Sequence, residues 1–376
     1  MRFHPASTRC LRLVACFAAA LITSSAFAQS VAQLEQQAIR DAIEHVSPTV
    51  VQLQIIGGAD RLNDVSLASG PSTGVILTPD GYVVTSRYRF EPAPATVVAL
   101  LADGRQFATE VVAHDYSRKL VLLKLSGAED LPAAEIAPAD SYRVGQWAIA
   151  VGRTYRVERP NVSVGIVSAL RRIQGRAMQT DAAVSAANYG GPLVDIEGRV
   201  LGIIAPMSPS AESSIAGVEW YDSGIGFAAP LAEWMPAFER LKQGEDLQLG
   251  YIGIGLVEGV ARETPAKIAT IAPDGPAAKA GLEKGDTVTA INGVPATTQV
   301  EMQAAAKPHY AGDTLEVTYQ RGDETSTTTL TLTTIAQLQE AAEAAKAKEE
   351  AADEKAEAKE GDADGEEESN AGDSEE

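Results

Sequence analysis

The chain has only two cysteines, Cys10 and Cys16, and both lie within its first 28 residues. This region has a basic start, an apolar stretch over 13–22 and the small-x-small motif Ala26-Phe27-Ala28, which is the pattern of a secretory signal. Cleavage near Ala28 would remove both cysteines. The exported chain would then have no disulfide, no thiol nucleophile and no thiolate metal site. The sequence therefore predicts a periplasmic or secreted protein that is stabilised by burial alone.

Long apolar runs are also missing. No segment after the signal reaches the roughly 18 consecutive apolar residues that a membrane-spanning helix needs, so we expect no transmembrane segment. A lipid anchor at Cys16 is the alternative to a cleaved signal, because 13–16 has some features of a lipobox. Cys16 lies inside the apolar stretch, however, and leaves too short an apolar region ahead of it, which favours the cleaved signal.

Histidine is scarce as well, with four in the chain and three beyond the signal, His45, His114 and His309. The sequence has no His-x-x-x-His, no Cys-x-x-Cys and no acidic calcium-loop spacing. We therefore expect neither a metal site nor a cofactor. Aromatic residues make up only 5% of the chain, which predicts mainly aliphatic cores.

Basic residues are outnumbered, 31 Lys and Arg against 51 Asp and Glu, for a formal net charge of −20. The segment 335–376 holds sixteen of the acidic residues and four lysines, so it carries most of this charge. Its first half, 337–360, is typical of a solvated single helix, and its second half of a disordered segment. A chain this acidic would repel phosphate, so nucleic-acid binding is not expected. We interpret 335–376 as an acidic solubilising tail.

Between the signal and residue 246 the chain is rich in predicted β-strands, with one predicted helical segment at each end of this region. Residues 30–46 show helical spacing before Pro48, and 230–243 predict a second helix, followed by a charged hinge at 243–246. Between them, short β-branched runs alternate with turn residues, which indicates a barrel or sandwich. The runs are 49–55, 74–77, 82–85, 96–101, 120–125, 147–151, 162–168 and 199–204.

A glycine-rich segment, Asn188-Tyr189-Gly190-Gly191-Pro192, has the frame of a serine-protease nucleophile loop. Further segments stand in the order known from the HtrA/Deg peptidases, at 74–85, 114–124, 165–169 and 224–230. On these motifs the chain resembles the trypsin-like HtrA/Deg (DegP-like) serine peptidase family over 49–242. The resemblance implies a mainly β fold with a chymotrypsin/trypsin-like double β-barrel.

A second group of motifs, at 250–254, 271–282 and 285–293, resembles the PDZ domain that follows the peptidase domain in this family. We expect this α+β domain to span 249–334, after a signal peptide at 1–28, a helical segment at 29–48 and a protease-like domain at 49–242. The resemblance implies that the backbone around Tyr251, Ile252, Gly253 and Ile254 receives a peptide C-terminus, which adds a strand to the sheet.

The catalytic positions of the family hold other residues here. The general base becomes Tyr88, the orienting carboxylate becomes Lys119, and the nucleophile becomes Tyr189, while a glycine that shapes the oxyanion hole becomes Ala187. Imidazole has a pKa near 6.5 and suits proton transfer at neutral pH, whereas phenol near 10 does not. Lys119 stands where a carboxylate would orient the histidine, and with Tyr88 at the base position there is no imidazole to orient. The sequence therefore predicts a degenerate triad, and a pseudoprotease rather than an enzyme.

Other interpretations of these positions stay open. We favour the two tyrosines filling the vacated cleft. Lys119 close to Tyr189 would instead favour a phenolate nucleophile, as in an unusual esterase or phosphoryl-transfer site. None of His45, His114 and His309 stands where the fold would place a base.

The predicted function is the binding of peptides or of unfolded polypeptide C-termini through the PDZ domain, as a scaffold, regulatory subunit or chaperone. One alternative is a member of the serine endopeptidase family that retains hydrolase activity through non-standard residues, and another is a structural envelope protein tethered by the acidic tail. The resemblance implies an oligomer, either a homo-trimer or a hetero-oligomer with an active paralogue.

Overall fold

A computed structural model describes residues 31–56, 61–62, 65–66, 71–90, 94, 96–207 and 224–344. The predicted signal and the tail beyond residue 344 lie outside this part. The chain forms two compact units, the first made mainly of residues before 246 and the second mainly of residues from 246 onward.

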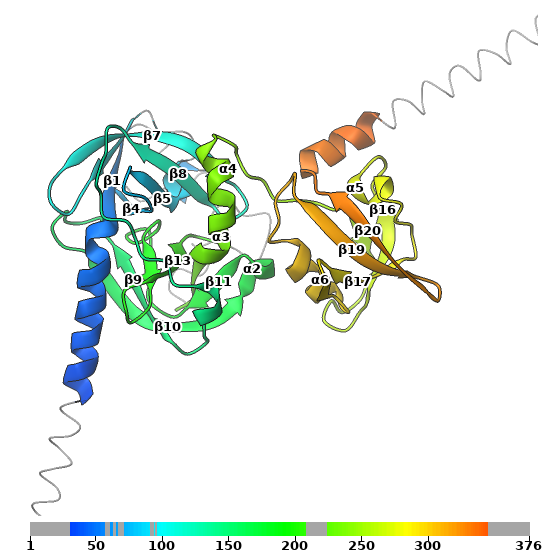
Figure 1. The fold of residues 1–376 in the computed structure, drawn as a ribbon, viewed down its shortest axis with the longest axis horizontal. Helices are drawn as coiled ribbons and strands as arrows, with labels where there is room; N and C mark the ends of the chain where they lie inside the picture. The colour runs from blue at the N-terminus through cyan, green and yellow to red at the C-terminus, as the bar shows by residue number, and fades with distance from the viewer. Residues whose placement is uncertain are drawn as a thin grey trace, which may run out of the picture. The chain divides into compact units, whose positions relative to one another are not determined.

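Two closed β-barrels make up the first unit (Figure 1). One has the strand order β1-β4-β5-β8-β7-β6 and the other β10-β11-β14-β13-β12-β9. The strands of the first barrel are β1 (Val50–Ile56), β4 (Ser72–Ile76), β5 (Tyr82–Ser86), β6 (Thr96–Leu100), β7 (Gln106–Asp115) and β8 (Leu120–Leu125). Those of the second are β9 (Trp147–Gly152), β10 (Asn161–Arg171), β11 (Ala177–Thr180), β12 (Pro192–Val194), β13 (Val200–Ile204) and β14 (Gly226–Pro230). A separate pair, β2 (Arg61–Leu62) and β3 (Val65–Ser66), forms a two-stranded sheet.

Aliphatic side chains fill the interior of each barrel, as the low aromatic content predicts. Strands β4 and β13 are buried along their whole length. Strand β13 reads as a nearly continuous apolar run, because both of its faces are covered. Strand β4 begins with Ser72 and Thr73, whose buried hydroxyl groups take part in hydrogen bonds. The predicted double-barrel fold is confirmed.

Helical segments flank the barrels. Residues 31–46 are helical, as expected, and Ser47–Thr49 continue as a single 3₁₀ turn, η1, that contains Pro48. The segment predicted as one helix at 230–243 consists instead of α3 (Leu231–Trp234), the 3₁₀ turn η4 (Met235–Ala237) and α4 (Phe238–Lys242). Pro236 lies in the first turn of η4 and has no N–H to donate to the preceding turn, which explains the interruption. The remaining short helical segments of this region are η2 (Arg87–Arg89), η3 (Ala139–Ser141) and α2 (Arg172–Gly175).

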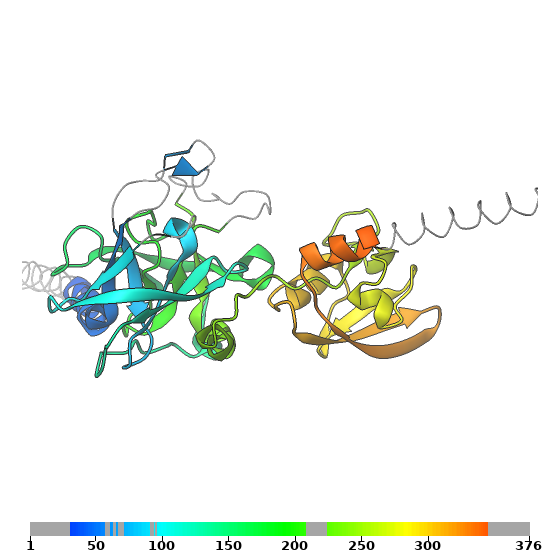
Figure 2. The same cartoon turned by 90° about the horizontal axis from the view of Figure 1, so that it is seen from above.

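The second unit has a β-sheet with the strand order β15-β16-β17-β19-β20, and β18 pairs with β17. The strands are β15 (Ile254–Leu256), β16 (Ala266–Ile271), β17 (Thr287–Ile291), β18 (Val294–Pro295), β19 (Thr314–Arg321) and β20 (Glu324–Thr331). Strands β19 and β20 form one long hairpin, which Figure 2 shows from above. Helix α5 (Pro276–Lys279) and helix α6 (Gln299–Ala306) accompany the sheet, and residues 335–344 are helical. Because β15 stands at the end of the strand order, one of its edges is unpaired within the sheet.

An ion pair between the exposed Arg321 and the buried Asp286 holds two parts of this sheet together. Arg321 donates to both oxygens of Asp286 at 2.8 Å and to Glu283 at 3.0 Å. The Asp286 side chain is only 1% exposed, and the hydrogen bond from Arg321 lowers its pKa.

Candidate functional site

The two tyrosines predicted at catalytic positions lie in contact. Tyr88 belongs to η2, directly after β5, and Tyr189 lies in the turn before β12. Their ring centroids are 5.2 Å apart and their planes are inclined by 70°, an edge-to-face arrangement. Tyr189 is 5% exposed and belongs to the hydrophobic core of the second barrel, against which the half-buried Tyr88 packs. The rings thus fill space between the ends of two strands that lie far apart in the sequence.

Lys119 reaches the same region through its backbone. Its carbonyl accepts a hydrogen bond of 2.8 Å from the N–H of Arg87, so the residue before β8 is fixed beside the first residue of η2. Lys119 has φ of 59°, which a non-glycine residue adopts infrequently. The structure therefore brings the three predicted triad positions into one region, through the ring contact of Tyr88 with Tyr189 and the backbone bond of Lys119 with Arg87.

The loop that carries Ala187 and Tyr189 directs its N–H groups inward. The N–H of Tyr189 donates to the carbonyl of Ser185 at 3.1 Å, and the N–H of Ala187 donates to the hydroxyl of Ser185 at 3.2 Å. An oxyanion hole needs such donors to point at the place where the substrate oxygen develops charge. In this conformation these two donors are already used within the loop.

The residue after Tyr189, Gly190, has to be a glycine for steric reasons. Gly190 has φ of 84°, and a Cβ built there would lie 2.2 Å from the carbonyl oxygen of Thr73. The carbonyl of Tyr189 accepts from the N–H of Thr73 at 3.4 Å and from the hydroxyl of Ser72 at 3.3 Å. The loop is thereby tied to β4 of the first barrel.

Two of the three histidines have partners elsewhere. His45 lies 3.4 Å from Glu135, and His309 lies 3.7 Å from Asp313 in the second unit. His114 is on β7. Within the described residues, no group of three or more His, Cys, Asp and Glu side chains is placed to share a metal ion. None of the helices described there combines the length and apolar character needed to cross a membrane.

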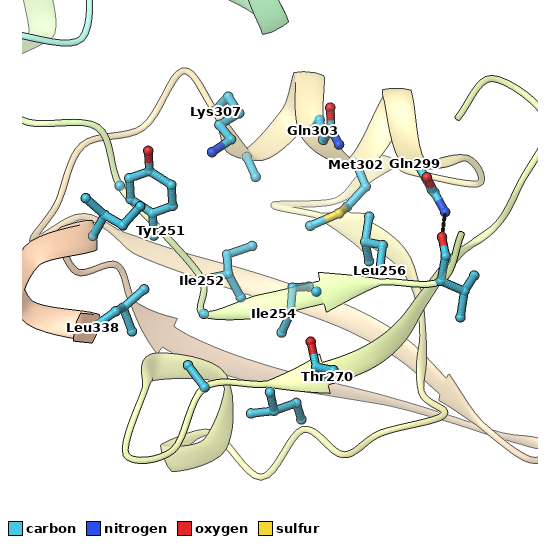
Figure 3. Close-up of a pocket in the computed structure, with 18 residues that line it drawn as sticks. Tyr251, Ile252, Ile254, Leu256, Thr270, Gln299, Met302, Gln303, Lys307 and Leu338 are labelled. Carbon is cyan, nitrogen blue, oxygen red and sulfur yellow. Dashed lines mark hydrogen bonds between the residues drawn. The ribbon is translucent and has the colours of Figure 1, made fainter. Parts of the chain in front are cut away.

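The second candidate site is a groove between β15 and α6, with a volume of about 630 Å³ (Figure 3). All four predicted peptide-binding residues, Tyr251, Ile252, Gly253 and Ile254, line it. The other lining residues are Gly250, Gly255, Leu256, Val257, Thr270, Ile271, Ala272, Gln299, Met302, Gln303, Ala306, Lys307, Ile335 and Leu338. The lining is predominantly apolar, with few charged or polar groups, which is typical of a ligand site.

The backbone at one end of this groove offers hydrogen-bond donors. The N–H of Tyr251 donates to Thr333, but within the described part of the chain the N–H groups of Ile252 and Gly253 have no acceptor. Gly253 has φ of 82°. A left-handed residue of this kind lets neighbouring N–H groups converge, and such a backbone nest attracts anions.

Sequence reasoning missed the helical side of the groove. Met302, Gln303 and Lys307 face it from α6 and from the residue that caps this helix, and Leu338 contributes from the helix at 335–344. The spacing 299, 302, 303, 306 is that of one helix face, so periodicity in this segment was the available signal. Nothing in the sequence indicated that Leu338 lines the groove, because it lies in a segment interpreted as a solvated tail.

The architecture agrees with comparisons to known proteins. Residues 72–203 match the trypsin-like peptidase domain family, and residues 250–332 match the PDZ domain family. Among curated relatives, the putative serine protease HhoB of Synechocystis sp. is 30% identical over 68% of this chain and 64% of its own length. The periplasmic serine endoprotease DegP of Escherichia coli is 32% identical over 66% of this chain and 53% of its own length. The chain thus spans less than two thirds of these relatives.

Solved structures give the same result. The serine endoprotease from Yersinia pestis is 29% identical, with a TM-score of 0.56 over 78% of this chain and 97% of that chain. The HtrA-type protease AlgW, determined with a tripeptide, is 25% identical, with a TM-score of 0.60 over 78% of this chain and 96% of that chain.

These comparisons correct one prediction. We expected a protein that is not an enzyme, yet relatives at about 30% identity are named serine endoproteases, which points to a protease. The expectation rested on the residues at four positions, Tyr88, Lys119, Tyr189 and Ala187. One fold supports many chemistries, so the loss of one familiar set of side chains is not sufficient to exclude hydrolysis.

Proposed function

From the premise that this chain is an HtrA/DegP-like protein with a trypsin-like peptidase domain followed by one PDZ domain, we propose that it binds the C-termini of exported polypeptides through its PDZ groove. The observation that carries the proposal is the pair of N–H groups at Ile252 and Gly253, which have no acceptor among the described residues and lie at the end of an apolar groove. The groove runs beside the edge of β15 that is unpaired within the sheet. The curated relatives named periplasmic support an exported, periplasmic setting.

Each part of the groove has a role in this proposal. The open edge of β15 pairs with the backbone of an extended peptide, and the two N–H groups receive its terminal carboxylate. Ile254, Leu256 and Met302 offer apolar contact to alternate side chains of the peptide. The solved structure of AlgW with a tripeptide supports peptide binding by a protein of this architecture.

A direct binding measurement tests this function. The probe is an N-terminally labelled octapeptide with an apolar C-terminal residue, titrated with a chain of residues 29–376 and followed by fluorescence anisotropy. We expect saturable binding with a Kd in the micromolar range, about −8 kcal/mol. Extending the peptide by a C-terminal Gly-Asp-Lys-Asp sequence should weaken binding, because the carboxylate no longer meets the loop. Equal binding of the two peptides would contradict the proposal.

Hydrolysis is the second candidate function, and the names of the relatives favour it. It would proceed through residues other than serine, histidine and aspartate at the three positions. Removal of one triad member from a serine protease lowers turnover by about 10⁴-fold to 10⁶-fold, so we expect slow cleavage. The inward N–H groups of Ala187 and Tyr189 would also have to turn outward to stabilise an oxyanion.

Incubation of the same chain with unfolded casein, followed by mass spectrometry of the products, tests the second function. Tyr189→Phe keeps the buried ring and its contact with Tyr88 but removes the hydroxyl group. Cleavage that disappears in this variant would assign a role to the Tyr189 hydroxyl. Cleavage that persists equally in Tyr189→Phe and Tyr88→Phe would contradict a role for either phenol.

A further inference from the structure

The end of the groove that carries the unpaired N–H groups also holds a lysine that no motif indicated. Lys307 caps the C-terminus of α6 and lines the groove. Its Nζ lies 4.2 Å from the centroid of the Tyr251 ring, and Figure 3 shows its nitrogen directed toward that ring. Tyr251 is the residue directly before the two unpaired N–H groups, so the positive charge and these donors belong to the same end of the groove.

An ammonium group is usually surrounded by water or paired with a carboxylate, and Lys307 has less of both. The residue is half-buried, and its burial lowers its pKa. Within the described residues, no carboxylate lies within ion-pair distance of its Nζ. The aromatic face of Tyr251 compensates only part of the lost hydration, because a cation–π contact is weaker than a charge-assisted hydrogen bond. A negatively charged ligand would supply the missing partner.

We propose that Lys307 is a specificity-determining residue that pairs with the terminal carboxylate of the bound peptide, together with the N–H groups of Ile252 and Gly253. The inference rests on the proposed peptide binding. It adds that Lys307 makes the groove prefer a peptide with a free terminal carboxylate over one with a neutral end. The N–H groups fix the direction of the carboxylate, and Lys307 supplies the full charge that backbone dipoles lack. Because the ammonium is partly removed from water, its attraction for a carboxylate is less screened than at an exposed site.

The alternative role of Lys307 is structural. A cation at the C-terminus of a helix is stabilising, and the methylene groups of lysine cover the Tyr251 ring. Such a role predicts a lower stability of the variant, with equal effects on all ligands. The two roles therefore differ in what happens to a peptide that lacks the charge.

The test uses two labelled octapeptides that end in valine and differ only in the last group, a free carboxylate or a carboxamide. Affinities are measured for residues 29–376 without substitution and for Lys307→Met, which keeps the apolar stem but removes the charge. We expect at least about tenfold tighter binding of the free acid by the unsubstituted chain. In Lys307→Met the free acid should lose about five- to tenfold in affinity, as expected for one charge-assisted contact, and the amide less than twofold.

Two controls separate charge and folding effects. Lys267→Gln removes one positive charge from an exposed position on β16 outside the groove and should leave both affinities unchanged. Lys307→Arg should restore most of the preference for the free acid. Equal losses for acid and amide in Lys307→Met, or no loss for either, would overturn the role of Lys307 while leaving peptide binding intact. Absence of binding to the unsubstituted chain would instead overturn the proposed function, and the role of Lys307 with it.

Discussion

The barrel site and the groove both contain a loop whose backbone N–H groups are suited to bind an anion, but the two loops use these groups in opposite ways. In the barrel, the N–H groups of Ala187 and Tyr189 donate to Ser185 within the loop. In the groove, those of Ile252 and Gly253 have no acceptor among the described residues. The same chemical group is thus satisfied by the fold in one place and left for a ligand in the other.

Side chains account for much of the difference. At the barrel site, the contacting rings of Tyr88 and Tyr189 take up the space in front of the loop. At the groove, the loop opens onto a volume of about 630 Å³. An unsatisfied buried N–H costs about 1–3 kcal/mol, so a loop without a ligand turns its donors inward unless a cavity leaves them to water. A set of N–H donors for which the described part of the fold supplies no acceptor is therefore the better indication of a binding site.

The largest expected effect comes from introducing the family's catalytic residues at the barrel site. A variant with Tyr88→His, Lys119→Asp, Ala187→Gly and Tyr189→Ser should cleave casein at least about 10³-fold faster than the unsubstituted chain, because a base, its orienting carboxylate and an alcohol nucleophile are then present. The backbone accepts aspartate at 119, since its φ of 59° is one that Asp and Asn adopt more readily than most residues. Turnover is followed by release of labelled peptides.

The matched control carries Tyr189→Ala in place of Tyr189→Ser, with the other three changes kept. It should show no gain. If the first variant is folded by circular dichroism and also shows no gain, the inward direction of the loop N–H groups, rather than the side chains, limits hydrolysis.

Next in size is the removal of backbone freedom at the groove. Gly253→Ala should weaken binding of the labelled peptide by about tenfold, because a left-handed φ costs a residue with a side chain roughly 1–2 kcal/mol. The added Cβ would also lie 3.3 Å from Leu338. Gly322→Ala is the control: this residue has φ of 61° with open space around it, in the β19–β20 turn. A peptide affinity that is equal in both variants would show that the loop conformation does not determine binding.

How far the sequence predicted these two sites depends on whether a feature is local. Strands such as 120–125 and 147–151 were predicted because apolar composition and turn residues act over short distances. The order in which twelve strands close two barrels came only through the family resemblance. The contact of Tyr88 with Tyr189 follows from that closure, whereas the inward N–H groups and the presence of Leu338 in the groove depend on packing that no local pattern records.

A smaller expected effect is a pH-dependent stability that applies to the second unit and not to the barrels. Asp286 has a pKa that the hydrogen bond from Arg321 lowers, so ionised Asp286 stabilises the folded groove unit above its unfolded pKa of about 4. This stabilisation is lost as the pH falls through the lower folded pKa. Asp286→Asn should therefore destabilise residues 246–334 by about 1–2 kcal/mol at pH 7 and by less at pH 3. Hydrogen exchange measured peptide by peptide reports each unit separately.

The comparison variant is Glu283→Gln, which alters an exposed partner of the same arginine and should have little effect. Exchange in the barrel strands should be unchanged in both variants. Equal destabilisation of barrel strands and groove strands would show that the two units do not unfold independently.

The smallest expected effect concerns the wall at the carboxylate end of the groove. Leu338 has its Cδ2 within 3.1 to 3.3 Å of the positions that a Cβ would take at Gly275 and Gly253, so its side chain packs onto the loop that binds the peptide terminus. A capping arrangement places it there, since the N–H of Gln337 donates to the Thr334 hydroxyl and the Gln337 side chain accepts from the N–H of Thr334.

Leu338→Ala should enlarge the space for the last side chain of the peptide. We expect the affinity for a peptide ending in phenylalanine, relative to one ending in valine, to rise about two- to threefold. The reason is that the larger side chain gains apolar contact equivalent to roughly one or two methylene groups in the enlarged space. Gln339→Ala, on the same helix and exposed, should leave this ratio unchanged. An unchanged ratio in Leu338→Ala would mean that the terminal side chain does not reach this wall. The groove would then recognise the carboxylate alone, and its contrast with the barrel site would rest on backbone donors rather than on shape.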